Sequence, residues 1–449
     1  MSNASAISRR GFLAASAAAS AALAWPARAQ QSARPNVVLL IIDTLRADAL
    51  GCYGSKVGAS AELDAIAAQS AQFMFTTAHA SWTLPSIGSL LTSQYPRTVG
   101  LFDSTDYLQE AAPLVSQELK AAGYRTMGTT ANAMINSVAG FSRGFDDYID
   151  AIINWKEKDK PRTKDSAKTF GEALELAKQK GAEPGYLQIN IMEAHEYYRG
   201  PGKLTRPEFD NLYPEITGSA HRREYFQAVR QASIDTKAFI DALRAMAGWE
   251  DTLFIILGDH GEGLNDHPHV WQSNSHGKLI YGSNVFVPMM WYYPGGNITP
   301  GQIYQPARLL DVVPTLLDFL GVQASPKHAG VSLKPLLGGS IDDVLVQDFI
   351  VSETYNDEWE KIGCFSSSWQ YIHHRDHHAG CSEFELQPAS GYVDGKRTNQ
   401  IKRHPDIAAR MAAYLEQWEA EHPRTQAVKA SDVSDTGNRK EELEALGYL

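Results

Sequence analysis

Three short apolar runs, each followed at once by polar residues, constrain the fold of this chain most strongly. The runs are Asn36–Ile42, Tyr186–Met192 and Leu253–Leu257. Runs of this length and composition are typical of strands that helices cover on both faces, as in a parallel sheet. Helical periodicity in the segments between them predicts an α/β fold with a mostly parallel sheet flanked by helices. The predicted helices span Glu62–Phe73, Leu114–Ala122, Ser166–Gln179 and Arg222–Met246.

The polar residues after the three runs would meet at one edge of such a sheet. Asp43 follows the first run, Glu193-Ala194-His195 the second and Gly258–Glu262 the third. In open α/β sheets, ligands bind beyond the carboxyl ends of the strands. One acid after a strand usually serves a turn or a helix cap. Three such clusters at three strand ends indicate a functional site instead.

Two of these clusters supply residues that suit a divalent metal ion. Asp43 and Asp259 offer hard carboxylate oxygens, and His260 adds an imidazole nitrogen. We expect Gly258 and Gly261 to let the backbone turn sharply around the two adjacent ligands. The alternative for Asp259 and His260 is a capped loop that carries a surface histidine.

A second informative stretch is Ser81–Thr92. Pro85 suits the first turn of a helix, and Leu90 and Leu91 would supply its buried face. Thr83 would then lie just ahead of the helix, where free N–H groups and the helix dipole favour an anion. The alternative is that Thr83 only caps this helix. A metal ion nearby would make its hydroxyl a candidate nucleophile.

Several segments, in chain order, resemble the motifs of sulfatases in the alkaline phosphatase superfamily. The segment Arg34–Val37 with Asp43–Gly54 resembles the opening motif, and Thr83–Thr92 resembles the nucleophile signature. The likeness runs from about residue 34 to the C-terminus, and it implies an alkaline-phosphatase-like sheet. Further similar segments are Asn190–Tyr198, Gly258–Glu262, His276–Tyr281 with Val287-Pro288, Asp311–Leu317 and Leu446–Tyr448.

The resemblance also implies roles for particular residues. Thr83 stands at the nucleophile position, and His195 and His276 would contact the anionic ester and its leaving group. One divalent ion is implied, Mn²⁺ or Ca²⁺ from the mostly oxygen ligand set; a second ion would involve Glu193, His195 and His276. The implied metal ligands are Asp43, Asp259, His260 and Thr83, and the implied substrate-binding residues are Lys278 and Asn132.

Four departures from the family pattern bear on the chemistry. Ile87 replaces the arginine of the nucleophile signature, Thr44 replaces an acid often found beside the first aspartate, and Glu193 replaces an aspartate. Thr83 replaces the Cys or Ser that is oxidised to formylglycine. The β-carbon of threonine carries a methyl group, so no aldehyde can form there.

Threonine must therefore attack directly and leave a covalent ester that water or an acceptor alcohol cleaves. In this superfamily, threonine nucleophiles go with phosphodiesterases and phosphoglycerol-type transferases, so the resemblance implies a hydrolase, or a transferase, acting on phosphodiesters or phosphonates. The alternatives are a sulfatase that works without formylglycine and an inactive, sulfatase-shaped binding protein.

The first 29 residues are typical of an export signal. Arg9-Arg10 precede Phe12-Leu13 and an alanine-rich stretch, and Ala27-Arg28-Ala29 offers small residues for a signal peptidase. Paired arginines in this setting resemble a twin-arginine signal, which is read by machinery that exports folded proteins. The apolar stretch is too short for a comfortable membrane span. We expect a periplasmic or secreted protein with no stable membrane anchor; a disordered tail with two chance arginines is the alternative.

The charge balance limits the class of partner. Lys and Arg total 41, Asp and Glu total 52, and the net charge is −11. A chain this acidic is a poor general binder of nucleic acid or of anionic lipid. We expect a small anionic ester, or an ester on a glycan or lipid, whose charge is met by a local site or a metal.

The character of the chain changes after residue 341. We expect a catalytic domain over 30–341 and a C-terminal α+β subdomain over 342–449, with strands at Trp369–Ile372 and Phe384–Leu386 and a helix at Pro405–Glu419. The segment His373–His378 is expected to be a solvated loop rather than a metal site. Cys364 and Cys381 could pair outside the cytoplasm, but their spacing does not decide this.

Overall fold

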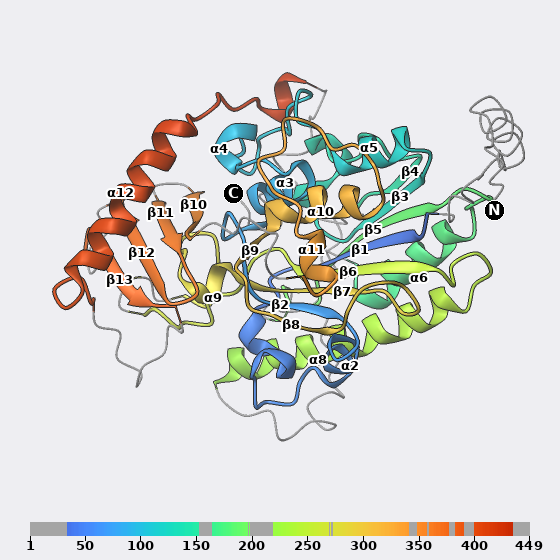
Figure 1. Cartoon of the computed structure of the whole chain (residues 1–449), viewed down its shortest axis with the longest axis horizontal. Coiled ribbons are helices and arrows are strands. Elements are labelled where there is room, and N and C mark those ends of the chain that lie inside the picture. The colour runs from blue at the N-terminus through green and yellow to red at the C-terminus, as the bar shows by residue number, and fades with distance from the viewer. Residues whose placement is uncertain are drawn as a thin grey trace, which may run out of the picture. The chain divides into compact units, whose positions relative to one another are not determined.

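A mostly parallel sheet lies at the centre of the protein, as predicted (Figure 1). The computed structural model describes residues 34–151, 164–195, 197, 219–268, 270, 273–340, 348–356, 359–376, 382–389 and 399–433. In this part of the chain the sheet has nine strands in the order β4-β3-β5-β1-β6-β7-β2-β8, with β9 also paired to β2. Only β7 runs antiparallel to its neighbours. The strands are β1 (Asn36–Ile42), β2 (Ala71–Thr77), β3 (Arg125–Thr130), β4 (Asp147–Ile149), β5 (Gly185–Ile191), β6 (Thr252–Gly258), β7 (Phe286–Tyr292), β8 (Gly301–Ile303) and β9 (Ala307–Arg308).

The three strands predicted from apolar runs are neighbours at the middle of this sheet. Ile42 of β1 lies opposite Ile191 of β5 and opposite Gly258 of β6. All three strands therefore end at the same level. The polar residues that follow them begin at one edge, which is the arrangement the sequence predicts.

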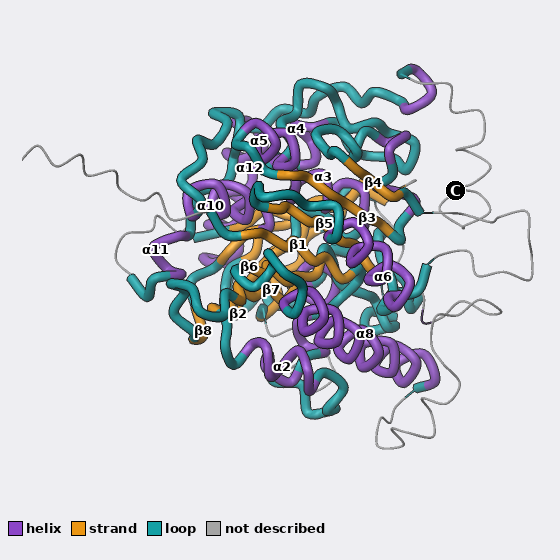
Figure 2. Tube along the Cα trace, turned by 90° about the vertical axis from the view of Figure 1, so that its right-hand side faces the viewer, coloured by secondary structure: helices purple, strands orange, loops and turns teal. Residues whose placement is uncertain are grey.

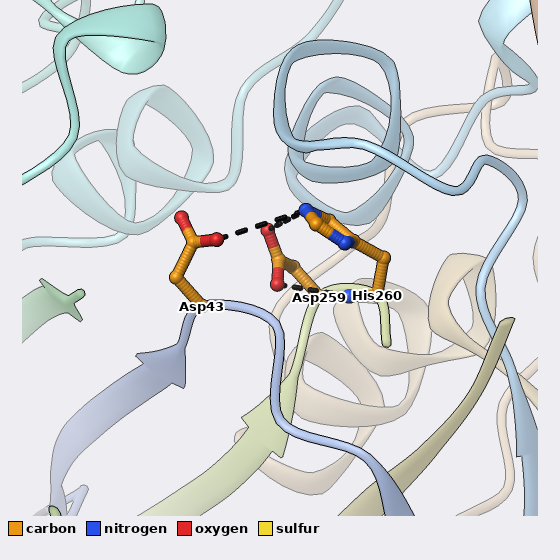
Figure 3. A group of neighbouring side chains, drawn as sticks. All are labelled: Asp43, Asp259 and His260. Carbon is orange, nitrogen blue, oxygen red and sulfur yellow. Dashed lines mark hydrogen bonds and ion pairs between the residues drawn. The ribbon is translucent and has the colours of Figure 1, made fainter. Parts of the chain in front are cut away.

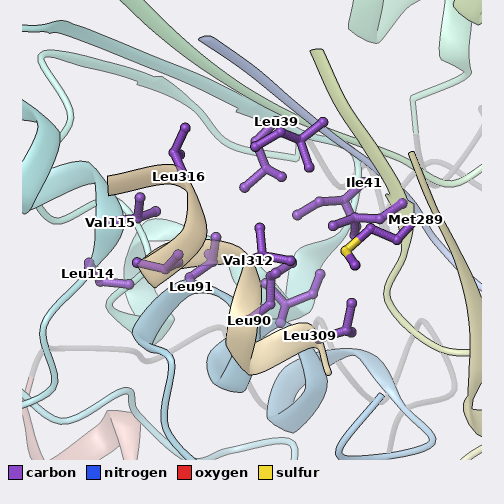
Figure 4. Packing of buried hydrophobic residues seen from close by; sticks show 14 of the residues in the cluster. Leu39, Ile41, Leu90, Leu91, Leu114, Val115, Met289, Leu309, Val312 and Leu316 are labelled. Carbon is purple, nitrogen blue, oxygen red and sulfur yellow. The ribbon is translucent and has the colours of Figure 1, made fainter. Parts of the chain in front are cut away.

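Alternating side chains of β1 divide the hydrophobic core between the two faces of the sheet. Leu39 and Ile41 belong to a cluster that includes helices α3, α5 and α10 (Figure 4). Leu40 and Ile42 belong to a second cluster with α2, α6 and α8, and Figure 2 shows helices on both sides of the strands. The helices named here are α2 (Ala61–Ala67), α3 (Thr83–Thr92), α5 (Val115–Ala121), α6 (Ser166–Ala177), α8 (Ala220–Arg244) and α10 (Val312–Phe319).

The predicted helices at α5, α6 and α8 are confirmed, but the predicted helix over Glu62–Phe73 is wrong in its second half. Helix α2 ends at Ala67, and just beyond this end the hydroxyl of Ser70 donates a hydrogen bond to the Ile66 carbonyl (2.7 Å). The next residues form β2, in which Phe73 pairs with Met289 of β7. Aromatic and threonine residues at this position suit a strand better than a helix.

A second sheet of four antiparallel strands lies in the C-terminal part, again as predicted. Its order is β10-β11-β12-β13, and the longer helix α12 packs on it through Met411, Leu415 and Trp418. The remaining elements are β10 (Ile350–Asn356), β11 (Trp359–Phe365), β12 (Trp369–His374), β13 (Phe384–Pro388), α4 (Pro96–Val99), α9 (Gly282–Val285), α11 (Lys334–Leu337) and α12 (Pro405–Glu421).

Some expectations about the ends of the chain lie outside the described residues. These are the export signal over 1–29, Cys381, and the motif at Leu446–Tyr448. The described residues from Pro35 onward form one compact unit, and the boundary between 341 and 342 stays a prediction. Among the described residues, no helix is both long and apolar enough to cross a bilayer. The expectation of a solvated loop is wrong for His374, which ends strand β12 and is buried.

Candidate active site

Asp43, Asp259 and His260 converge at the shared edge of the three central strands (Figure 3). All three side chains are fully buried, and their ligand atoms lie within 4.8 Å of one another. The burial of His260 excludes the alternative of a surface histidine on a capped loop. The structure therefore brings together the three residues predicted to hold a metal ion; their role as ligands stays a prediction.

The hydrogen bonds of this group leave lone pairs on Asp259 and His260 available to a ligand. Asp259 Oδ1 accepts hydrogen bonds from the backbone N–H groups of Thr44 (3.1 Å) and His260 (2.8 Å). Asp259 Oδ2 is buried, accepts no hydrogen bond from a described residue and lies 3.4 Å from His260 Nε2. His260 Nδ1 must donate to the Gly261 carbonyl (2.9 Å), because a carbonyl only accepts, and Nε2 then keeps its lone pair.

The electrostatics of the group also favour a cation. Burial, and then repulsion from Asp43, raises the pKa of Asp259 well above its usual range. Burial lowers the pKa of His260 well below its usual value, so the imidazole is neutral. Two buried carboxylates and a neutral imidazole nitrogen form a donor set that fits one divalent ion, which would compensate the buried negative charge.

Thr83 faces this group from the first position of helix α3. Its hydroxyl oxygen lies 3.3 Å from His260 Nε2 and 3.5 Å from Asp43 Oδ2. The helix begins one residue earlier than expected: Trp82 is the N-cap, and no side chain makes a capping hydrogen bond there. The alternative in which Thr83 only caps the helix is therefore wrong. Helix α3 is tied to the ligand group by Ser86, whose hydroxyl donates to the Asp259 carbonyl (2.6 Å).

Asn132, at the end of β3, also reaches the group. Its amide nitrogen donates to Asp43 Oδ2 (2.7 Å) and to the hydroxyl oxygen of Thr83 (3.3 Å). Its amide oxygen accepts from the backbone N–H of Met134 (2.8 Å), which sets the orientation of the amide. The predicted substrate-binding asparagine thus lies where it can orient both a ligand and the hydroxyl.

His195 and His276 lie beside the ligand group, as predicted. The ring centroid of His276 lies 4.6 Å from that of His260 and 5.1 Å from that of His195. Nδ1 of His276 lies 3.3 Å from both carboxylate oxygens of the buried Glu262. Sequence reasoning missed Glu262 as the partner of His276. The only available signal was its place in the motif Gly258–Glu262.

Two other residues named from the sequence make contacts outside the Asp43, Asp259 and His260 group. Lys278 Nζ lies 5.6 Å from the ring of Trp359 in the second sheet. The Glu193 carboxylate accepts hydrogen bonds from the backbone N–H (3.1 Å) and hydroxyl (3.0 Å) of Ser166 at the start of α6, and burial raises its pKa to about 8. Among the described residues, the group of three His, Cys, Asp or Glu side chains whose ligand atoms lie close together is Asp43, Asp259 and His260, and Glu193 is not part of it; a second ion stays a prediction.

The glycines of the ligand loop have a different purpose from the one expected. A Cβ atom on Gly258 would lie 2.5 Å from the Leu45 carbonyl oxygen, and one on Gly261 would lie 2.0 Å from that of Ser283. Neither glycine has a positive φ, so the backbone turn does not require glycine at these positions. Glycine is required because the loop passes too close to Leu45 and Ser283 to leave room for a Cβ atom. The left-handed residue is Thr44, at φ 56°, next to Asp43. Ile87 stands where the nucleophile signature of the family has arginine, but it is buried in the hydrophobic core. This position therefore supplies no positive charge to the site.

Residues 35–322 match the family model for sulfatases. The chain belongs to the sulfatase family. This match confirms two predictions at the level of the family. The chain is a member of the alkaline phosphatase superfamily, and it is a hydrolase of sulfuric or phosphoric esters.

Three known proteins that are similar to this chain share between 18% and 26% of their residues with it over the matched ranges. The ulvan-active sulfatase of Formosa agariphila is 26% identical over 341 residues, which are 68% of this chain and 65% of that protein. A 2-O GAG sulfatase has a TM-score of 0.70 at 18% identity, covering 87% of this chain and 92% of the other. The phosphonate monoester hydrolase of Agrobacterium radiobacter has a TM-score of 0.68 at 18% identity, covering 87% and 96%. The two structures confirm the predicted fold.

Proposed function

We propose that this protein is a metal-dependent hydrolase of phosphodiesters or phosphonates that works through a covalent ester on Thr83. The observation that carries the proposal is the position of the Thr83 hydroxyl, 3.3 Å from His260 Nε2 at the edge of the group that fits a divalent ion. If the only role of Thr83 were in helix α3, its hydroxyl would not need to lie beside two buried carboxylates.

Asp43, Asp259 and His260 would hold one divalent ion, with Mn²⁺ or Ca²⁺ as our proposal from the mostly oxygen donor set. When bound, such an ion lowers the pKa of a nearby hydroxyl and stabilises negative charge on a non-bridging oxygen of the ester. The protein carries a net charge of −11, so this local charge would be needed to attract an anionic substrate.

The residues of the chain then account for the remaining steps. The Thr83 hydroxyl, oriented by Asn132 Nδ2 at 3.3 Å, releases its proton to solvent and forms a bond to phosphorus while the bond to the leaving oxygen breaks. His195 or His276 donates a proton to that oxygen. Water, or an acceptor alcohol, then attacks the covalent ester, which releases the acid group and restores the hydroxyl of Thr83.

Threonine chemistry favours phosphorus over sulfur as the reaction centre. A sulfate ester on Thr83 has no aldehyde route of release, whereas direct attack of water can cleave a phosphoryl or phosphonyl ester. A sulfatase that works without formylglycine is the second candidate. It is favoured by the similarity of this chain to proteins that are described as sulfatases. An inactive binding protein is disfavoured, because the buried side chains of Asp43, Asp259, His260 and His195 cost free energy without a ligand to compensate them.

The decisive experiment is a panel of 4-nitrophenyl sulfate, phosphate monoester, phosphodiester and phosphonate, assayed with defined divalent metals. We expect the phosphodiester or the phosphonate to be hydrolysed fastest. Strong preference for the sulfate would overturn the proposed substrate and leave the family assignment in place. Absence of both bound metal and turnover would favour the binding-protein alternative.

We also propose that the protein acts in the periplasm or outside the cell, after export in folded form. The support is the pair Arg9-Arg10 ahead of an alanine-rich stretch. Loading of the metal before export would follow from this route. The natural substrate would then be a small anionic ester, or an ester on a glycan or lipid, that is present outside the cytoplasm.

A further inference from the structure

Strand β10 of the second sheet contacts both segments that carry active-site groups. The backbone N–H of Glu353 donates to the His79 carbonyl (3.0 Å), four residues before Thr83. The hydroxyl of the next residue, Thr354, donates to the Gly277 carbonyl (2.5 Å), one residue after His276. The side chains of Glu353 and Thr354 are both buried. Two consecutive residues of β10 thus bridge the nucleophile segment and the histidine segment.

The peptide groups around Gly277 are held from two sides. The N–H of Gly277 donates to the Ser81 carbonyl (3.0 Å), and its own carbonyl accepts from Thr354. Gly277 has a φ of 89°, a left-handed conformation that only glycine adopts without strain. The backbone beside His276 therefore keeps its place through two hydrogen bonds, one from the nucleophile segment and one from β10.

The ring of His276 is held separately, by Glu262. Because Nδ1 faces the Glu262 oxygens at 3.3 Å, the nitrogen that remains for a substrate is Nε2. The carboxylate sets the direction of the ring, while the hydrogen bonds of Gly277 set the place of the backbone. A buried ion pair between Arg97 and Glu353, at 2.9 Å, fixes β10 against the helix that follows α3.

We propose that Thr354 is a positioning residue, which holds His276 at the distance from Thr83 at which its imidazole can protonate the leaving oxygen. This inference rests on the proposed function, and it selects His276 for the proton transfer that the proposed function leaves open between two histidines. A displacement of about 1 Å at a reacting group can cost about a hundredfold in rate. Valine at position 354 keeps the shape of threonine but lacks the donor.

The test compares Thr354→Val and Thr354→Ser with a matched control, Thr252→Val. The Thr252 hydroxyl also donates to a backbone carbonyl at 2.5 Å and is buried, but it lies at the opposite end of β6 from Asp259. The substrates are the 4-nitrophenyl and the phenyl monoesters of methylphosphonate. Nitrophenolate leaves readily as an anion, whereas phenolate depends more on a proton from the enzyme.

We expect Thr354→Val to lower kcat for the phenyl ester by about tenfold or more, and for the nitrophenyl ester by about threefold at most. Thr354→Ser should recover most of the loss, since the donor returns. Thr252→Val should lower kcat for the phenyl and the nitrophenyl ester by the same factor, or leave both unchanged. Its loss of Tm should be similar to that of Thr354→Val. Metal content should stay at the wild-type value in all three variants.

Equal losses for the two esters in Thr354→Val, or no loss, would overturn the positioning role. Failure of Thr354→Ser to recover the phenyl ester rate would also count against it. A wild type that hydrolyses neither of these esters nor the phosphodiester of the substrate panel would contradict the proposed function itself, and this inference with it. The two failures are therefore distinguishable by the wild-type rates alone.

Discussion

Replacement of Thr83 by alanine separates a nucleophile from a structural threonine. The Thr83 hydroxyl makes its close approaches to His260 Nε2, Asp43 Oδ2 and Asn132 Nδ2, and none to the helix that it begins. If the hydroxyl attacks the ester, Thr83→Ala removes the covalent step. We expect kcat/KM to fall by roughly a thousandfold or more, which corresponds to about 4 kcal/mol in the barrier.

The stability of the same variant should change little. Thr83 is buried, and alanine removes one methyl group from a packed site, which costs about 1 kcal/mol. The three metal-binding side chains remain, so elemental analysis should find the wild-type metal content. Thr83→Ser keeps the attacking hydroxyl and should retain substantial activity.

A matched control lies at the other end of the same helix. The buried Thr92 hydroxyl donates to the Gly88 carbonyl (2.7 Å), so Thr92→Ala removes a threonine from α3 without touching the site. We expect a comparable loss of Tm and wild-type turnover. An active Thr83→Ala enzyme, or an equal loss of turnover in the two alanine variants, would refute the reasoning.

Three further predictions concern the metal, pH and export. The purified protein should hold one tightly bound divalent ion, and Asp259→Asn should lose it; elemental analysis without metal, with activity unchanged by a chelator, would contradict this. Burial raises the pKa of Glu193 to about 8 in the folded protein. At pH values between the ordinary carboxyl pKa and about 8, the folded state therefore binds more protons than the unfolded state. Stability should therefore fall as the pH rises through this window, by up to about 1.4 kcal/mol per pH unit, and urea unfolding of Glu193→Gln should show a weaker dependence. Arg9→Lys combined with Arg10→Lys should leave an uncleaved precursor in the cytoplasm, since lysine lacks the planar guanidinium; fractionation that finds normal periplasmic delivery would count against the signal.

The central strands were predictable because burial on both faces requires a nearly continuous apolar sequence. Strands β1, β5 and β6 meet this condition, and their shared edge made the meeting of Asp43 with Asp259 predictable as well. Strand β3 was not predicted, because Arg125–Thr130 is rich in threonine and has no apolar run. Strand β2 was taken for the end of a helix, since its alanine and phenylalanine also fit a helical period.

The parts of the site that depend on tertiary contacts were not predictable from the sequence. Thr354 lies 77 positions from Gly277, and their hydrogen bond exists only because the second sheet packs beside the histidine segment. The direction of a side chain within a loop cannot be predicted from the sequence either. Glu193 lies two residues after the end of β5, and its carboxylate accepts a hydrogen bond from Ser166 at the start of α6. Spacing along the chain places a backbone at a strand end, but it does not determine where the side chain points.

The central claim, a covalent ester on Thr83, is tested most directly by mass spectrometry of the enzyme quenched in acid during turnover of 4-nitrophenyl methylphosphonate. The account predicts that the peptide containing Thr83 gains the mass of one methylphosphonyl group, and that Thr83→Ala gains none. The same peptide from the resting enzyme should carry unmodified threonine. Turnover with no adduct at any time, or an adduct on another residue that persists in Thr83→Ala, would contradict the account.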